Sequence, residues 1–264
     1  MQGSEKKRKK FPYFRNPVEN DQDTEFLCTE ITYVIDDEPY WGPVLRLYGV
    51  NASGNSVCCK VRNFQPYFYS TGLVDDLENK IREKRDNKKV PKHIQSIVSV
   101  EAVKRQPLMG YSPNGQISMY KITLSSPKFV PIARNFLESA GHLTYEASTL
   151  YELRFMVDKG FGGCDWLRPI NVKPTVKRET TCQLEFECDN VIKFEQEKRP
   201  QIRGLSFDFE CCKLKGRGFV DAEIPTDPII CIGNTLYDGD DNMIDERTFC
   251  WGGNGTALPI PRGE

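Results

Sequence analysis

The chain has 264 residues, 39% apolar and 11% aromatic, so it can bury a substantial core and is not disordered throughout. Its 36 Lys and Arg residues nearly balance 37 Asp and Glu residues, and the formal net charge of -1 gives no overall basic or acidic field. No apolar stretch approaches the roughly 18 residues of a membrane span, and the first ten residues lack the apolar segment of a secretory signal. We therefore expect neither secretion nor a membrane partner.

The first 22 residues are predicted to be a disordered tail, because they are polar and have little to bury. The tail contains a basic cluster, Lys6, Lys7, Arg8, Lys9 and Lys10. Such a cluster is typical of a nuclear import signal, of an arm that contacts nucleic-acid phosphates, or of an ordinary solvated charge run. All three interpretations stay open, and the first predicts a nuclear location.

Residues 26–37, 44–50 and 56–61 are predicted to be strands, since β-branched and aromatic residues dominate them. The five residues 51–55 connect the last two strands and include Gly54. A short connection with glycine is typical of a hairpin loop, so these two strands should pair antiparallel.

Two amphipathic helices are predicted further along, because apolar residues recur at helical spacing within 73–85 and 128–140. Strands are predicted between them at 94–103 and 117–124. This order is compatible with a small α+β layer of the ferredoxin or RNA-recognition kind. An RNA-reading module is nevertheless disfavoured, because no segment has the aromatic pattern with which such modules stack bases.

Ten cysteines without a secretory signal are expected to be reduced thiols rather than a disulfide framework. A zinc site is disfavoured, because no two cysteines have the C-x₂-C spacing and the only histidines are His93 and His142. The adjacent pairs Cys58-Cys59 and Cys211-Cys212 lie in apolar runs, where cysteine behaves as a small hydrophobe. We expect both pairs in the core.

A change of composition near residues 196–200 predicts a boundary, because charges and a proline precede an apolar strand at 205–210. A second apolar strand is predicted at 229–232, and the segment after residue 238 is rich in turn residues. The predicted organisation is a tail (1–22), a first domain (23–200) and the beginning of a second, incomplete domain (201–264).

Asp208 and Glu210 are the strongest candidates for a metal-binding and catalytic role. Side chains two apart in a strand share a face, so both carboxylates can meet one cation, while Phe207 and Phe209 take the opposite face. Oxygen ligands suit Mg²⁺ or Mn²⁺, and a pair of such ions supports phosphodiester hydrolysis. An isolated D-x-E pattern is more often a solvated face; here two acids interrupt an otherwise apolar strand.

Several segments in order resemble one family. Residues 204–211 and the strand at 227–233 resemble the first exonuclease motif of family B DNA polymerases and its pairing strand. Upstream segments are similar to the amino-terminal region of delta-type catalytic subunits; they are 44–50, 56–59, 64–69, 151–158 and 163–166. The resemblance extends from about residue 26 to 235.

The resemblance implies an α+β fold, with a β-rich amino-terminal domain and covering helices at 23–200. The opening strands of a ribonuclease H-like 3′–5′ exonuclease domain would follow at 201–264. Asp208 and Glu210 match the motif's two catalytic, metal-binding acids, which implies Mg²⁺ or Mn²⁺ once the full domain is present. Phe209 replaces the family's usual Ile on the buried face, which leaves the ligands in place.

The implied parent protein is a replicative DNA polymerase that proofreads and acts on a DNA primer-template, with accessory subunits and a sliding clamp as possible partners. The family's later exonuclease motifs and polymerase domain do not occur before Glu264, so this chain is expected to be inactive alone. The alternative is a non-catalytic DNA-binding or interaction module that retains the same fold.

Other matched residues are expected to serve the architecture. They are Tyr67, Tyr69, Arg154, Asp158 and Trp166.

Overall fold

The computed structural model describes most of the chain after residue 23. The described residues are 24–36, 41–86, 89–107, 115–175, 178–197, 200, 202–213, 216, 218–224, 227–238, 242–252 and 256–259. The chain divides into two compact units, residues 1–51 with 55–196 and residues 197–264 with 52–54. The predicted α+β class is confirmed, since strands dominate and three α-helices lie among the described residues.

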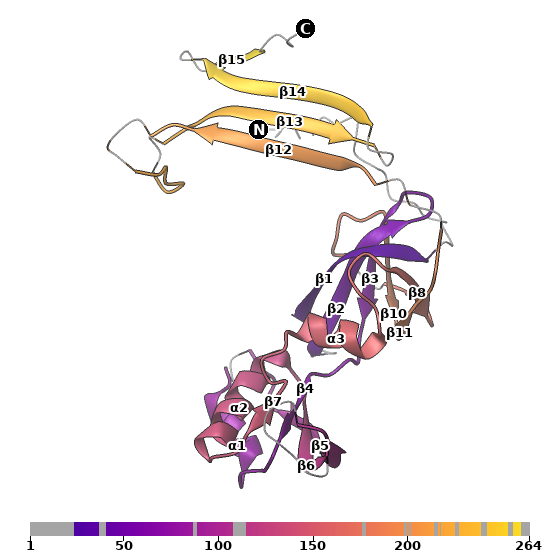
Figure 1. Ribbon diagram of the computed structural model, residues 1–264, viewed down its shortest axis with the longest axis vertical. Helices are drawn as coiled ribbons and strands as arrows, with labels where there is room; N and C mark the ends of the chain where they lie inside the picture. The colour runs from indigo at the N-terminus through magenta and orange to yellow at the C-terminus, as the bar shows by residue number, and fades with distance from the viewer. Residues whose placement is uncertain are drawn as a thin grey trace, which may run out of the picture. The chain divides into compact units, whose positions relative to one another are not determined.

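A seven-stranded sheet forms the larger part of the first unit (Figure 1). In sheet order its strands are β11 (Asn190–Lys193), β8 (Trp166–Ile170), β1 (Phe26–Asp36), β2 (Gly42–Asn51), β3 (Ser56–Val61), β10 (Leu184–Cys188) and β9 (Lys173–Pro174). Among the described strands, only β3 and β10 pair in parallel. The predicted hairpin is confirmed, because β2 and β3 pair antiparallel and the Asn55 N–H donates to the Asn51 side chain at 2.8 Å.

Gly49 on β2 is required by the close approach of β1. A Cβ atom at this position would lie 2.0 Å from the carbonyl oxygen of Leu27. Two backbone segments therefore occupy the space that any side chain would need.

Helix α3 (Tyr151–Lys159) packs on the large sheet, where Phe155 is fully buried among residues such as Phe26 and Leu45 (Figure 1). The helix ends at Gly160, whose φ of 67° is left-handed, the usual conformation after a helix. This helix was not predicted from the sequence.

A second, four-stranded sheet lies in the same unit, with two helices on it (Figure 1). Its elements in chain order are β4 (Tyr67–Ser70), α1 (Leu77–Lys84), β5 (Ile97–Arg105), β6 (Ile117–Leu124), α2 (Val130–Ser139), which follows the 3₁₀ turn η1 (Pro127–Phe129), and β7 (Thr144–Tyr145). The strand order β5-β6-β4-β7 with this β-α-β-β-α-β sequence is the ferredoxin-like arrangement. The expected layer type is confirmed.

Two boundaries in this layer differ from prediction. Helix α1 begins at Leu77 rather than Leu73, because Asp76 takes a left-handed φ of 59° that no helix continues through. Strand β5 begins at Ile97 rather than Ile94, because the Ile94 N–H closes a turn onto the carbonyl of Pro91.

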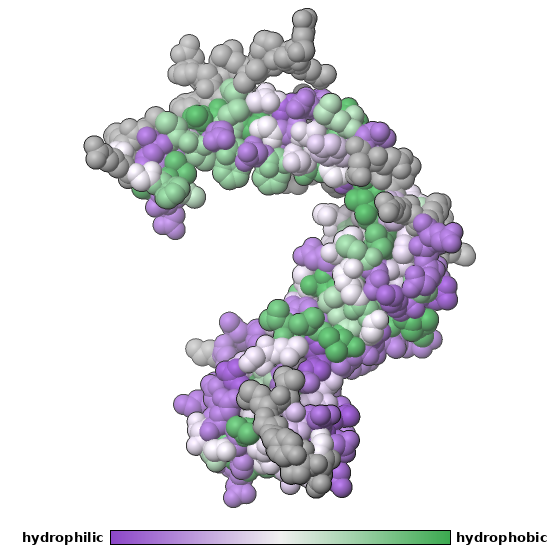
Figure 2. All heavy atoms as spheres, viewed as in Figure 1, coloured by the Kyte–Doolittle hydropathy of each residue, from purple (hydrophilic) through white to green (hydrophobic). Residues whose placement is uncertain are grey.

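The second unit contains an antiparallel sheet of β12 (Gly204–Cys211), β13 (Ile229–Tyr237), β14 (Met243–Gly252) and β15 (Thr256–Pro259), in that order. The two predicted strands are confirmed, and β14 and β15 were not predicted. Apolar surface lies along this sheet in Figure 2, and Phe207 is 63% exposed.

The cysteines divide between the two units. Cys58 and Cys59 are fully buried, as predicted, and burial raises the pKa of Cys58 to about 12. The prediction for Cys211 and Cys212 is wrong: both are half-exposed, because the sheet of the second unit leaves its faces open. No disulfide joins the ten cysteines, all of which lie among the described residues.

Within the described residues, no helix combines the length and apolar character needed to cross a membrane.

Candidate metal centre

Asp208 lies near the centre of β12 and Glu210 next to its last residue, Cys211, and both carboxylates are exposed. Their spacing places them on one face of the strand, while Phe207 and Phe209 take the other. The backbone N–H of Phe209 donates to Asp208 Oδ1 at 2.9 Å. Neither carboxylate forms an ion pair with another described residue, so both are available to a cation.

The neighbouring strand leaves room in front of Asp208. Asp208 pairs with Gly233 of β13, and a Cβ atom at Gly233 would have no atom within 4 Å. A glycine opposite a carboxylate keeps this part of the face free of side chains.

Glu210 begins a row that crosses three strands. It pairs with Cys231 of β13, which pairs in turn with Cys250 of β14. The two sulfur atoms are 3.1 Å apart. The hydrogen bond with Cys250 is the largest cause that raises the pKa of Cys231, followed by burial and by the negative charges of Cys250 and Glu210. Cys231 is therefore held as a neutral thiol beside Glu210.

The donor set fits a hard divalent cation, because two exposed carboxylates share an open face. The fit is partial: among the described residues, no group of three or more His, Cys, Asp or Glu side chains is placed to hold a metal ion. Asp208 and Glu210 thus form a single carboxylate pair, which is fewer ligands than a two-ion site uses.

The other predicted contact residues cannot be placed. Lys6, Lys7, Arg8, Lys9 and Lys10 lie outside the described residues.

The residues expected to serve the architecture join α3 to the smaller sheet. The Tyr67 hydroxyl donates to the Asp158 carboxylate at 2.9 Å, and the guanidinium of Arg154 lies 4.9 Å from the Tyr67 ring centroid. Arg154 also pairs with Glu146. Trp166, buried against Phe194, is a core residue as predicted.

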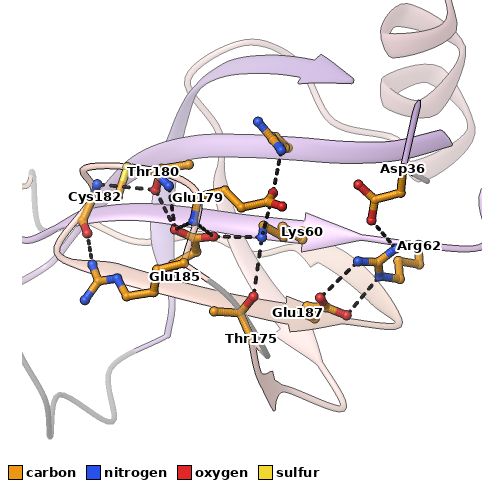
Figure 3. Close-up of polar contacts among 11 residues, drawn as sticks. Asp36, Lys60, Arg62, Thr175, Glu179, Thr180, Cys182, Glu185 and Glu187 are labelled. Carbon is orange, nitrogen blue, oxygen red and sulfur yellow. Dashed lines mark hydrogen bonds and ion pairs between the residues drawn. The ribbon is translucent and has the colours of Figure 1, made fainter. Parts of the chain in front are cut away.

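A buried ion pair in the large sheet was not predicted from the sequence (Figure 3). Lys60 Nζ on β3 lies 2.7 Å from Glu185 on β10 and 3.1 Å from Glu179, and the Glu185 side chain has no exposed surface. Thr180 donates its hydroxyl to Glu185 at 2.8 Å. No local pattern pairs residues so distant in the chain.

Protonation in this pair follows from competing effects. Burial raises the pKa of Glu185, but bonds from Lys60 and Thr180 outweigh it, and the net pKa falls below 4.5. Burial lowers the pKa of Lys60, but bonds to Glu185 and Glu179 outweigh it, and the net pKa rises above 10.5. The pair is therefore charged at neutral pH and ties the parallel strands β3 and β10 together.

Comparisons with known proteins agree with the resemblance. Residues 143–253 match the family model described as DNA polymerase family B, exonuclease domain. DNA polymerase delta catalytic subunits from Dictyostelium discoideum and Arabidopsis thaliana are each 35% identical to the chain, over 82% and 74% of its length. The one from Mesocricetus auratus is 34% identical over 72%.

A solved structure shares the fold. The family B DNA polymerase from Pyrobaculum calidifontis superimposes with a TM-score of 0.63 at 24% identity, over 87% of this chain and 27% of that one. The chain spans about a fifth of the length of the curated relatives it matches, 23% for Dictyostelium and 20% for Arabidopsis. Because the exonuclease-domain match and the delta-type relatives together cover β12 and most of the first unit, the chain belongs to the family B DNA polymerases.

Proposed function

We propose that the chain is part of a delta-type replicative DNA polymerase and that β12 provides the first two acidic ligands of its 3′–5′ exonuclease site. The observation that carries this proposal is the exposed pair Asp208 and Glu210 on an otherwise apolar strand within the matched range 143–253.

The proposed cofactor is Mg²⁺ or Mn²⁺, held by Asp208 and Glu210 with further ligands. Such an ion, when bound, supplies a Lewis acid that favours hydrolysis of the terminal phosphodiester. The protein's own contribution is positional: β12 fixes the two carboxylates on one face, and Gly233 leaves space in front of Asp208.

The remaining parts of the proposal concern the whole polymerase. Residues 23–200 would form the amino-terminal domain and residues 201–264 the start of the exonuclease domain. The substrate would be a DNA primer-template in the nucleus, and accessory subunits and a sliding clamp are candidate partners. The basic cluster at residues 6–10 would serve nuclear import or phosphate contact.

Binding of Mn²⁺ tests the carboxylate pair directly. We expect weak binding, with a dissociation constant of about 1 mM, because two carboxylates are fewer than a tight site uses. Paramagnetic broadening of backbone resonances around residue 208 measures it. Asp208→Asn and Glu210→Gln should each reduce the broadening, whereas Glu101→Gln, which alters an exposed acid of the first unit, should not. Equal broadening in Asp208→Asn would remove the site assignment.

Exonuclease activity of the chain itself provides a second test. We expect no degradation of a mismatched primer end with Mg²⁺, because one carboxylate pair lacks the groups that hold a second ion and orient water. Loss of several kcal/mol of transition-state stabilisation predicts at least a roughly thousandfold lower rate than a complete site. Degradation that Asp208→Ala abolishes would show that the chain holds a full ligand set.

A further inference from the structure

Two pairs of cysteines bring their sulfur atoms into contact, one pair in each unit. Cys59 and Cys188 have their sulfur atoms 3.2 Å apart in the large sheet of the first unit. Cys231 and Cys250 have theirs 3.1 Å apart in the sheet of the second unit. All four thiols are free. Because the two distances are nearly equal, any difference in reactivity must come from strand register and exposure.

Strand register favours a covalent bond in the second unit. Cys231 and Cys250 are directly opposite each other on the antiparallel strands β13 and β14. Directly opposite residues of such strands have Cα atoms about 4.5–5.5 Å apart, which is within the range that a disulfide spans. The sulfur atoms need to approach each other by only about 1 Å to reach bonding distance. A cross-strand disulfide therefore fits here without movement of the backbone.

The pair in the first unit lacks this register. Cys59 is opposite Phe186 on the parallel strands β3 and β10, and Cys188 lies two residues further along β10. A rise of about 3.3 Å per residue and a strand spacing of about 4.8 Å place the Cα atoms of the two cysteines roughly 8 Å apart. A disulfide does not span more than about 7 Å unless the backbone moves. Contact between these sulfur atoms is packing rather than preparation for a bond.

Exposure separates the two pairs in the same sense. Cys59 has no exposed surface and Cys188 is 3% exposed, so a dissolved oxidant does not reach them in the closed core. Cys231 and Cys250 are both half-exposed, because the sheet of the second unit leaves its faces open. Access is a requirement for thiol oxidation, and the second pair meets it.

We propose that Cys231 and Cys250 form a site of reversible oxidation, which a low-molecular-weight disulfide such as glutathione disulfide converts into a cross-strand disulfide. One thiol loses its proton and attacks glutathione disulfide, whose S–S bond breaks and releases one glutathione. The second thiol loses its proton and attacks the resulting mixed disulfide, which releases the second glutathione. The two protein thiols lose two electrons, and glutathione disulfide is reduced by the same two electrons.

The bond would join β13 to β14, whose cysteines are 19 positions apart in the chain. Closing a loop of this length lowers the conformational entropy of the opened sheet, so the strands should separate less often. Glu210 is opposite Cys231 on the other side of β13, and oxidation would therefore stiffen the strand beside the candidate metal centre. The inference does not require that Asp208 and Glu210 bind a metal, so failure of the exonuclease proposal would leave it intact.

Peptide mass mapping of the chain after treatment with glutathione disulfide tests the proposal. The remaining thiols are blocked with N-ethylmaleimide before digestion. We expect the peptides that contain Cys231 and Cys250 to be joined, with the loss of two hydrogen atoms, and dithiothreitol to separate them. Cys59 and Cys188 are the matched control in the same sample and should be recovered as free thiols. Cys164, which is exposed, should acquire glutathione and so show that the oxidant is active.

Single-cysteine variants test the second step of the exchange. Cys231→Ser and Cys250→Ser each remove one thiol, so the remaining cysteine should retain glutathione instead of releasing it. Stable glutathione on both cysteines of the original chain would overturn the proposal. So would a Cys231–Cys250 bond that forms no more readily in the native chain than in urea, because the fold would then not direct the pairing.

Hydrogen exchange tests the effect on the sheet and needs no variant. Oxidation should slow amide exchange in β13 and β14 by up to about a hundredfold, the effect expected from closing a loop of this length. Exchange in α3 of the first unit should not change, and the oxidant should have no effect on β13 in Cys231→Ser. Unchanged exchange in a chain whose bond is confirmed by mass would show that the bond joins separated strands, which would exclude a cross-strand disulfide in the folded sheet.

Discussion

Glu185 on β10 and Glu210 on β12 each lie one residue from an end of their strand, but their surroundings are opposite. The Glu185 side chain has no exposed surface and is bonded to Lys60 and Thr180. Glu210 is exposed and forms no ion pair with another described residue. A carboxylate that is paired with a buried cation stabilises the fold. An exposed carboxylate without such a partner remains available for a ligand. Burial and partner, rather than residue type, separate a structural carboxylate from a candidate functional one.

The phenylalanines of the two units show the same contrast. Phe155 of α3 is fully buried, with ring contacts to Phe64 and Phe161 at 5.0 and 5.8 Å. Phe207 of β12 is 63% exposed. The first unit therefore carries its own core, while the sheet of the second unit presents apolar side chains that nothing described covers.

The largest expected difference comes from truncating these two phenylalanines. Phe155→Ala should lower the free energy of unfolding by about 3–5 kcal/mol, because it leaves a cavity in a closed core. Phe207→Ala should change it by less than about 1 kcal/mol, because little packing is lost. Urea unfolding, followed by tryptophan fluorescence and circular dichroism, measures both. Similar losses would contradict the contrast in packing.

Removal of the buried cation should have the next largest effect. Lys60→Met should destabilise the first unit by about 3 kcal/mol, because Glu185 is left buried without its charged partner. The double variant Lys60→Met with Glu185→Leu should recover most of this loss. Lys104→Met, at an exposed position, is the matched control and should be within about 0.5 kcal/mol of the original chain. A neutral Lys60→Met would show that the pair contributes nothing to stability.

A pair of strand glycines sharpens the comparison further. Gly49→Ala places a Cβ atom 2.0 Å from the Leu27 carbonyl oxygen, and we expect a loss of about 2 kcal/mol as the backbones move apart. Gly233→Ala meets nothing within 4 Å and should cost little stability. Thermal melting of both variants measures the difference in stability, and Gly49→Ala should melt at the lower temperature. Equal melting temperatures would mean that β1 and β2 are packed less closely than described.

The pH dependence should be the smallest effect and should belong to the first unit. The pKa of Glu185 lies below 4.5, so its stabilisation is present above pH 4.5 and is lost as pH falls through the lower folded value. The pKa of Lys60 lies above 10.5, so its stabilisation is present below that pH and is lost above it. Urea midpoints from pH 3 to 7 should fall at the acid end, and less steeply in Glu185→Gln. A steeper fall in that variant would reverse the assigned sign.

Local sequence patterns were sufficient to predict the hairpin of β2 and β3, the strand β12 and the helix α2. Each of these elements is specified by residue spacing and turn residues within one segment. Helix α3 escaped prediction, since its exposed Leu153 and Val157 obscure the apolar stripe of Tyr151 and Phe155. The pairing of Lys60 with Glu185 could not be predicted, because the partners meet only through a long-range parallel contact. The shared face of Asp208 and Glu210 could be predicted, because side chains two apart in a strand lie on the same side.

The parallel pairing of β3 with β10 also constrains the order in which the first unit forms during synthesis. The whole ferredoxin-like layer lies between these strands in the chain, so β3 must wait for its neighbour until the ribosome has added the intervening residues, on the order of ten seconds at usual rates. The layer itself consists of contacts closer in sequence and can form during that delay. We therefore expect the ferredoxin-like layer to fold before the large sheet is complete. Until β10 is synthesised, the unpaired edge of β3 is the part of the large sheet most exposed to aggregation.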